Sequence, residues 1–247
     1  MTHRRWIAEI WDDTSATIAG AQAEHLARVL RAQPGMEADV VAGGRVFHGK
    51  VEAVALDGER SEVRFSLGDE LQADPALPVT LVLAVYKFDR MEWAIEKATE
   101  LGVAAIAPVI ARRTEKHLAQ AAAKRAERWR RIVREASQQA RRCDVPLVHD
   151  PVSLADGVQA WSASARIVLA EQERATTLRR TVEDAVSAAK NEIPAFALAI
   201  GPEGGWAPSE ETLFESSGWR AASLGPRILR AETAAIVALA VVASCLE

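Results

Sequence analysis

Two short segments rich in glycine and proline lie near the C-terminus and are well suited to bind a small polar molecule. They are residues 200–206 (IGPEGGW) and 224–233 (LGPRILRAET). Each follows an apolar run typical of a buried strand and precedes a predicted helix, so both would lie at the carboxyl ends of strands, where parallel α/β sheets bind ligands. The pair predicts one pocket walled mostly by backbone N–H and C=O groups. The alternative is a pair of tight turns that hold no ligand.

The glycine pattern of these segments disfavours two common nucleotide sites. Dinucleotide-binding loops carry GxGxxG, and phosphate-binding P-loops end in Gly-Lys followed by serine or threonine. Neither pattern occurs in residues 200–206 or 224–233. A nucleotide-binding dehydrogenase is therefore a disfavoured alternative for this chain.

The second segment also carries charged side chains at positions where a substrate could meet them. Arg227 and Arg230 lie three residues apart, directly before Glu232 and Thr233 at the start of the last predicted helix. Arg227 could instead form a structural ion pair. Glu232 suits the positive end of a helix and Thr233 can cap it, so both have a structural interpretation as well.

Composition points to a globular protein of one or two domains. The chain has 247 residues, of which 49% are hydrophobic and 26% charged. Cys143 and Cys245 lack metal-ligand spacing and disulfide patterning, which is typical of a reducing cytoplasm. Five histidines occur singly and predict no metal site. They are His3, His25, His48, His117 and His149.

The apolar segments predict neither a secretory signal nor a membrane span. The first residues lack a long apolar region, and the longest apolar stretch, residues 234–246, is too short to cross a bilayer comfortably. That stretch instead predicts a helix buried on several faces or packed against a second subunit. The expected location is the cytoplasm.

Basic residues concentrate in one region although the net charge is −4. Residues 112–142 contain eleven Lys and Arg but only three Glu. Such a bias is compatible with a solvated helix face crossed by salt bridges, and equally with a surface that binds a polyanion. The sequence leaves both interpretations open.

Hydrophobic periodicity divides the chain into two parts. Residues 1–70 contain short alternating strands at barrel-like spacing, interrupted by a helical segment, AEHLARVLR. An acidic, proline-containing stretch predicts a linker at 71–78. From residue 79 to 247, apolar strands alternate with helices, which predicts an α/β domain with a mostly parallel sheet covered on both faces. The longest expected helix is basic and covers residues 118–142.

The two C-terminal segments resemble those of the knotted SPOUT methyltransferases, and more closely those of the RsmE family, the small-subunit (16S) ribosomal RNA uracil-N3 methyltransferases. The resemblance extends over nearly the whole chain, through residues 25–31 (HLARVLR), 87–103 (KFDRMEWAIEKATELGV), 128–142 (RWRRIVREASQQARR) and the VPLV segment. The chain departs from the family pattern at RRTEKH (112–117), where the family tends to have ERS, and around Gln138 to Cys143. The departures affect how this region would grip RNA and leave the cofactor loops untouched.

The resemblance implies a PUA-like RNA-binding β-barrel, a SPOUT domain with a trefoil knot, a homodimer and S-adenosylmethionine as cofactor. It implies that Arg230 stabilises the negative charge that develops on the uracil ring, with Glu232 as general base or as the group that orients Arg230. The expected cofactor-binding residues are Leu169, Ala170, Glu171, Ile200, Gly201, Pro202, Gly204, Gly205, Leu224, Gly225, Ile228, Leu229, Arg230 and Thr233. The expected phosphate contacts of the RNA are Arg28, Arg31, Lys87, Arg141 and Arg142.

Two further functions remain compatible with the same residues. A related SPOUT methyltransferase would act on another ribosomal RNA base or on transfer RNA. A non-catalytic RNA-binding or ribosome assembly protein would keep the fold without the chemistry, although the intact glycine loops and Arg230 disfavour it.

Overall fold

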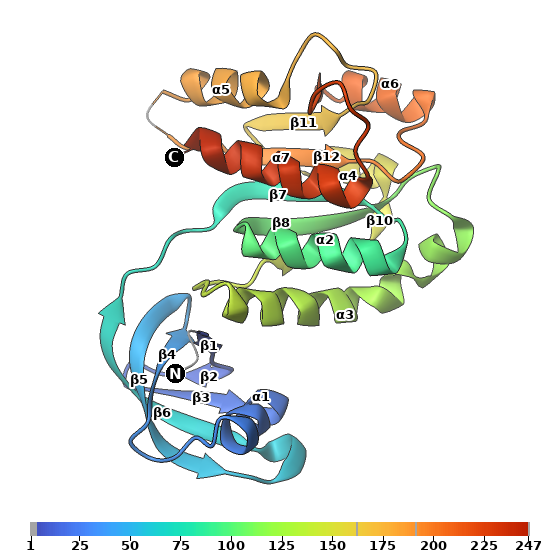
Figure 1. Ribbon diagram of the computed structural model, residues 1–247. Coiled ribbons are helices and arrows are strands. Elements are labelled where there is room, and N and C mark those ends of the chain that lie inside the picture. The colour runs from blue at the N-terminus through green and yellow to red at the C-terminus, as the bar shows by residue number, and fades with distance from the viewer. Residues whose placement is uncertain (1–3, 162, 191, 247) are drawn as a thin grey trace. The chain divides into compact units, whose positions relative to one another are not determined.

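The computed structural model describes residues 4–161, 163–190 and 192–246, and the side chains of all of these except Glu59 (Figure 1). His3, one of the isolated histidines, lies outside the described residues. The chain divides into two compact units. The N-terminal unit comprises Met1–Pro75 and Ser137–Val145, and the C-terminal unit comprises Ala76–Ala136 and Pro146–Glu247.

The N-terminal unit contains a curled six-stranded sheet with the order β1-β4-β5-β6-β3-β2. β1 runs parallel to β4, and the other neighbours are antiparallel. Two register shifts in the β5–β6 pair bend the sheet, because a bulge increases the local twist. The elements are β1 (Trp6–Ile7), β2 (Ile10–Trp11), β3 (Ser15–Ala19), α1 (Gly20–Glu24), a π-helical turn (His25–Val29), β4 (Glu37–Ala42), β5 (Arg45–Ala55), a short 3₁₀ turn (Gly58–Arg60) and β6 (Glu62–Leu71).

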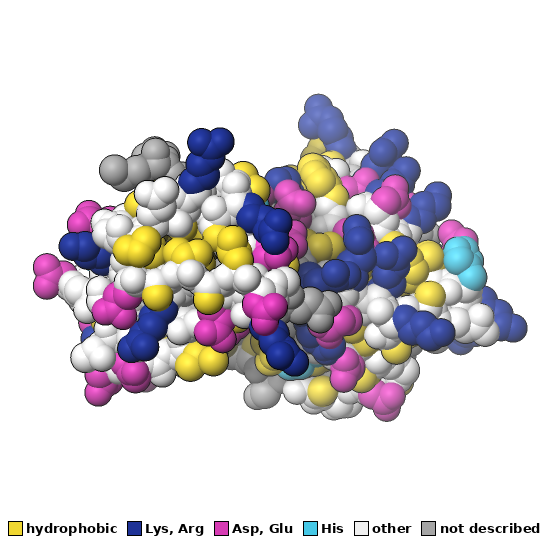
Figure 2. All heavy atoms as spheres, turned by 90° about the horizontal axis from the view of Figure 1, so that it is seen from below, with side chains coloured by type: hydrophobic (Ala, Val, Ile, Leu, Met, Phe, Trp, Pro, Cys, Tyr) yellow, Lys and Arg dark blue, Asp and Glu magenta, His cyan; other side chains and the backbone are white. Residues whose placement is uncertain are grey.

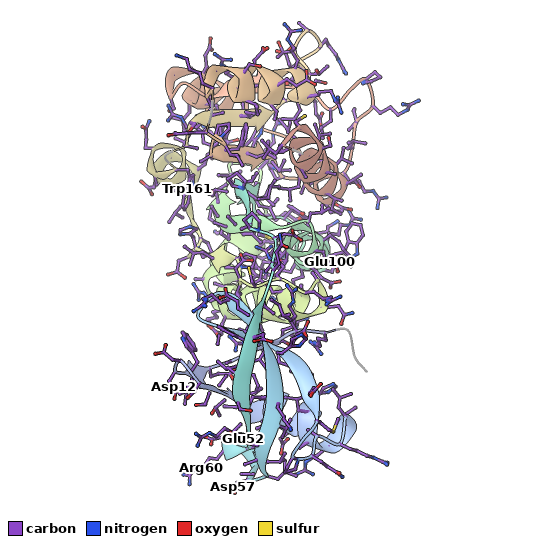
Figure 3. All side chains as sticks on the ribbon, turned by 90° about the vertical axis from the view of Figure 1, so that its left-hand side faces the viewer. Asp12, Glu52, Asp57, Arg60, Glu100 and Trp161 are labelled. Atoms are coloured by element: carbon purple, nitrogen blue, oxygen red, sulfur yellow. The ribbon has the colours of Figure 1, made fainter. Side chains whose placement is uncertain are left out.

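Alternating side chains of these strands build the core of the N-terminal unit. Trp6, Ile18, Val63 and Phe65 are almost completely buried in one hydrophobic cluster. The polar turns lie outside it: Asp57 and Arg60 lie between β5 and β6, at one end of the sheet (Figure 3). The predicted helical segment after β3 is present, although it is divided between α1 and the π-helical turn.

The C-terminal unit contains a parallel sheet of seven strands, as the apolar strand pattern predicts. Its order is β10-β8-β7-β12-β11-β13, with β9 also paired to β8, and all of these pairs are parallel. The strands are β7 (Leu77–Ala84), β8 (Val103–Ile110), β9 (Leu147–Val148), β10 (Val152–Ser153), β11 (Ala165–Leu169), β12 (Phe196–Ile200) and β13 (Arg220–Ala222). Every residue of β12 is buried, which explains its unbroken apolar sequence.

Helices pack against this sheet in two groups. α7 contacts α2, α5 and strands β7 and β12, whereas α4 contacts α6 and β8 (Figure 1). The helices are α2 (Phe88–Glu100), α3 (Lys116–Gln139), α4 (Leu154–Ala160), α5 (Leu178–Ala188), α6 (Pro208–Ser216) and α7 (Ala231–Leu246). α2 buries Met91, Ala94, Ile95 and Ala98, which recur at helical spacing along one face.

Two boundaries differ from the sequence expectation for a local reason. α3 ends at Gln139 rather than at residue 142, because Arg141 adopts a positive φ of 58°. The amide of Arg142 then donates to the carbonyl of Ser137 at 2.9 Å, which caps the helix. At the expected linker 71–78, β6 extends to Leu71 and β7 begins at Leu77.

Candidate active site

A cavity of about 380 Å³ opens at the carboxyl ends of β11, β12 and β13. Three loops form most of its wall: residues 169–174 after β11, 200–206 after β12, and 222–231 between β13 and α7. Its size lies within the range of small-molecule sites. The two glycine and proline segments therefore share one cavity, as the sequence predicts.

The structure brings together nearly all of the residues expected to bind the cofactor. Those that line the cavity are Leu169, Ala170, Glu171, Ile200, Gly201, Pro202, Gly204, Gly205, Leu224, Gly225, Ile228, Leu229 and Arg230. Thr233 and Glu232 are not among the lining residues. Both lie in the first turn of α7, where Ala231 and Ala234 face the cavity instead.

Trp206 joins the first and second loops of the cavity. Its indole Nε1 donates a hydrogen bond to the carbonyl of Leu169 at 3.2 Å. The ring is 5% exposed and packs edge-on against Phe214 of α6, at 4.8 Å between centroids. The end of β11 and the loop after β12 are therefore held at a fixed separation.

The third loop turns at Gly225, whose φ of +116° strongly favours glycine. Ser223 stabilises this turn, because its hydroxyl bonds both the amide and the carbonyl of Gly225, at 3.1 and 3.2 Å. The backbone of Ser223 pairs with Thr176 and Leu178, with both bonds at 2.9 Å. These bonds attach the third loop to the end of the first.

A carboxylate organises the outer part of the first loop. Glu173 Oε1 accepts hydrogen bonds from the amides of Ala175 and Thr176, at 2.6 and 2.8 Å. These bonds hold the pKa of Glu173 below its ordinary value, because they stabilise the ionised form. The side chain of Glu173 therefore holds the first loop, which carries Glu171 and Arg174 to the cavity, in a closed turn.

Acidic and basic side chains meet beside the cavity. Arg90 on α2 bonds Glu203 of the second loop at 2.7 Å, and Lys87 approaches the same carboxylate at 3.6 Å. Glu232 Oε1 lies 4.0 Å from Arg90 Nε. The cluster connects the start of α2, the glycine loop and the start of α7, and it gives Lys87 a protein partner.

Glu232 is a buried carboxylate behind the cavity wall. It is 6% exposed, and its Oε2 has no hydrogen-bond partner among the described residues. Tyr86 is buried nearby, and its pKa is raised far above the ordinary value by burial first and then by the carboxylates of Glu232 and Glu203. The phenol of Tyr86 therefore stays protonated, so it can donate a hydrogen bond but cannot serve as a general base.

Arg230, like Arg227, differs from Arg90, Arg113 and Arg174 in that its side chain has no internal partner among the described residues. The residue is exposed and lines the cavity, and it makes no hydrogen bond or ion pair with the side chains that the structure describes. Arg90 and Arg113, which also line the cavity, are both bonded to the second loop. Arg230 is thus free to meet a ligand.

The residues expected to contact RNA have different environments. Arg28 and Arg31 are exposed, and Arg28 forms an i,i+4 pair with Glu24 at 3.4 Å. Arg141 is exposed near Asp39, whereas Arg142 is 9% exposed and bonded to Asp144. Arg142 therefore has an internal ion pair and little accessible surface.

Several residues that line the cavity were not among those named from the sequence as cofactor contacts. They are Arg90, Arg113, Gln172, Arg174, Glu203, Trp206, Glu211, Ala222, Ser223, Arg227, Ala231 and Ala234. Glu203 and Trp206 lie within the glycine segment 200–206, so their position was a usable signal. Arg90 and Arg113 come from segments about a hundred residues earlier and gave no such signal.

Neither a metal cluster nor a membrane-crossing helix occurs in the part of the chain that the structure describes. Residues 4–161, 163–190 and 192–246 contain no group of three or more His, Cys, Asp or Glu side chains that could hold a metal ion. No helix in these ranges is both long and apolar enough to cross a membrane.

The sheet and its cavity define an α/β protein that binds a small molecule at the carboxyl edge of a parallel sheet. The family model for the RNA methyltransferase domain matches residues 73–243. Ribosomal RNA small subunit methyltransferase E of Synechocystis is 35% identical over 95% of this chain and 75% of its own length. The chain belongs to the RNA methyltransferase family, among the small subunit methyltransferases E.

Solved structures agree with this assignment. The methyltransferase E of Neisseria gonorrhoeae, bound to S-adenosylmethionine, has a TM-score of 0.76 and 27% identity, covering 96% of this chain and 95% of its own. A methyltransferase of Legionella pneumophila, also with bound S-adenosylmethionine, has a TM-score of 0.81 and 30% identity. The coverage is 98% of this chain and 96% of that one.

Proposed function

We propose that this protein transfers the methyl group of S-adenosylmethionine to N3 of a uridine in small-subunit ribosomal RNA. The observation that carries the proposal is the convergence of three loops on one cavity in a chain of the methyltransferase E family. Relatives with this fold hold S-adenosylmethionine.

The lining of the cavity fits this cofactor. Leu169, Ile200, Leu224 and Leu229 provide apolar surface for an adenine ring, and the adjoining backbone offers N–H and C=O groups. Glu171 and Arg174 lie at the first loop and suit the polar parts of a nucleoside and an amino acid. S-adenosylmethionine would supply an electrophilic methyl carbon attached to a sulfonium sulfur. After the methyl transfer, the rest of the cofactor would leave as a neutral thioether.

Arg230 is the residue that we assign to catalysis. Uracil N3 becomes a nucleophile only after its proton has passed to solvent, and the resulting negative charge spreads onto the ring oxygens. An unpaired guanidinium at the cavity can stabilise that charge, as an oxyanion-hole donor does. Glu232 is buried and does not line the cavity. We therefore assign it the role of positioning Arg90, which it approaches to 4.0 Å.

The target uridine must leave its stack to reach the cavity, and the protein must hold the surrounding RNA. Base-modifying enzymes act on unstacked or extruded nucleotides. Figure 2 shows Lys and Arg side chains gathered over α3 on the face of the molecule that is seen from below. Together with Arg28, Arg31 and Arg141, these side chains are the proposed contacts of the phosphates.

Three finer features of the architecture belong to the proposal. The N-terminal unit is a PUA-like barrel, supported by its curled six-stranded sheet. The chain is knotted near the cavity, as the resemblance of residues 200–206 and 224–233 to the SPOUT methyltransferases implies. The protein is a homodimer, supported by the half-buried apolar side chains of α7 and by Trp93, which is 47% exposed on the adjacent α2. Its location is the cytoplasm, supported by its relatives among the ribosomal RNA methyltransferases.

A methylation assay tests the function. Small-subunit particles and free ribosomal RNA from cells that lack this enzyme are incubated with labelled S-adenosylmethionine, and the nucleosides are identified by mass. The expected product is 3-methyluridine. Label in another nucleoside, or only in transfer RNA, would assign a different substrate. Cofactor binding without any transfer would favour an RNA-binding or assembly role.

A further inference from the structure

Two loops that are distant in the sequence are cross-linked beside the cavity by reciprocal hydrogen bonds. One loop, residues 111–115, connects β8 to α3, and the other, residues 201–207, connects β12 to α6. Arg113 Nη1 donates to the backbone carbonyls of Gly204 and Trp206, the latter at 3.0 Å. In return, Glu210 of α6 accepts from the amide of Arg112 at 2.8 Å.

Two peptide planes in the loop 201–207 are each held by hydrogen bonds at both their carbonyl and their amide. The Gly204–Gly205 peptide has its carbonyl on Arg113 and its amide on the carbonyl of Pro202, at 2.8 Å. The Trp206–Ala207 peptide has its carbonyl on Arg113 and its amide on Glu210, at 2.8 Å. A peptide plane held at both its donor and its acceptor cannot rotate without breaking a bond.

The side chain of Arg113 also lies directly on the loop. A Cβ added to Gly204 would lie 3.3 Å from the Cδ of Arg113, so a side chain at position 204 would push Arg113 slightly out of its place. Glu210, which holds the other end of the arrangement, is 5% exposed. Both loops therefore form one braced structure, and Arg113 itself reaches the cavity.

We propose that Arg113 is a positioning residue for the cofactor, which sets the backbone of residues 204–206 before the cofactor arrives. The inference rests on the proposed function, since it assumes that S-adenosylmethionine occupies the cavity. Trp206 extends the effect to the first loop, because its indole bonds Leu169 while its carbonyl bonds Arg113. Without Arg113, the loop samples other peptide orientations, and binding must restore the competent one.

Arg113→Ala and Arg113→Lys test the proposal, with Arg112→Ala as the matched control. Arg112 is the adjacent exposed arginine, and its side chain makes one contact, at 3.4 Å to Ser209. Arg113→Ala is expected to raise both the dissociation constant and the KM of S-adenosylmethionine about tenfold, as for the loss of charge-assisted bonds to two carbonyls. At saturating cofactor, kcat should stay within about twofold.

The comparison separates positioning from general stability and from the proposed function. Arg113→Lys should recover part of the affinity, and Arg112→Ala should bind like the wild type. Calorimetry with S-adenosylmethionine needs no RNA, so a failure of the wild type to methylate RNA would count against the proposed function and leave this comparison intact. Wild-type affinity in Arg113→Ala, or an equal loss in Arg112→Ala, would overturn the inference.

Discussion

Replacing Gly225 with alanine isolates the contribution of loop conformation to cofactor affinity. Gly225 has a φ of +116°, and no atom lies within 4 Å of a Cβ built on it, so the substitution strains the backbone without crowding any neighbour. Holding a residue in such a sparsely populated region costs about 1–3 kcal/mol. The loop can avoid that cost by turning away from the conformation that Ser223 stabilises.

The strain appears as lost affinity if the cofactor binds only the observed loop. Each 1.4 kcal/mol corresponds to about tenfold, so Gly225→Ala should raise the dissociation constant of S-adenosylmethionine by about 5- to 150-fold. Isothermal calorimetry measures this directly. Chemical unfolding without cofactor should show a smaller change, because the relaxed loop no longer carries the full strain.

Gly35 offers a control with the same kind of backbone and no role in the site. Its φ is +94°, a Cβ there would also meet nothing within 4 Å, and it lies before β4 in the N-terminal unit. Gly35→Ala should lower stability without changing cofactor affinity. Binding by Gly225→Ala within about twofold of the wild type would refute the reasoning, because it would mean that the loop conformation is irrelevant to the bound state.

Three further predictions concern catalysis, folding and pH. Arg230→Ala should lower kcat by about 10²–10³-fold, as for the loss of an oxyanion donor, with little change in cofactor affinity by calorimetry; near-normal turnover would remove the assigned role. Glu210→Ala should lower the free energy of unfolding in urea by about 2–4 kcal/mol, because two amides lose their acceptor; an equal loss in Glu215→Ala, an exposed carboxylate on the same helix, would contradict this. Burial lowers the pKa of His149, against the opposing effect of Asp150, so the folded protein binds this proton less readily than the unfolded chain. The free energy of unfolding should therefore fall as pH drops through about 6.5. In His149→Gln, the midpoint of thermal unfolding should depend less on pH between pH 5 and pH 8 than in the wild type. Equal pH dependence in the two proteins would exclude this histidine as the cause.

The elements and the cavity loops were largely predictable because their signals are local. An unbroken apolar run such as residues 196–200 identifies a buried strand, and glycine and proline directly after it identify a sharp turn. The repeated order of strand and helix then places such turns at the carboxyl edge of a parallel sheet. The sequence therefore located most of the cavity wall before any strand order was known.

The surroundings of individual charged residues were not predictable in this way. Glu232 lies next to Arg230 in the sequence region of the site, yet it is buried beside Arg90 and does not line the cavity. Arg142 belongs to a basic run, yet it is buried in an ion pair with Asp144. Both outcomes depend on which side chains from elsewhere in the fold come close.

By itself, the sequence determined the classes of element, the places where the chain must turn, and the family to which those turns belong, since each follows from residue types within a few positions. Only the tertiary structure decided which loops share the cavity, because the order of strands in a parallel sheet depends on packing between distant segments. It also decided that Arg113 braces the glycine loop while Arg230 remains without an internal partner. The physical reason is that the role of a charged side chain depends on the donors, acceptors and solvent around it, which the fold assembles from the whole chain.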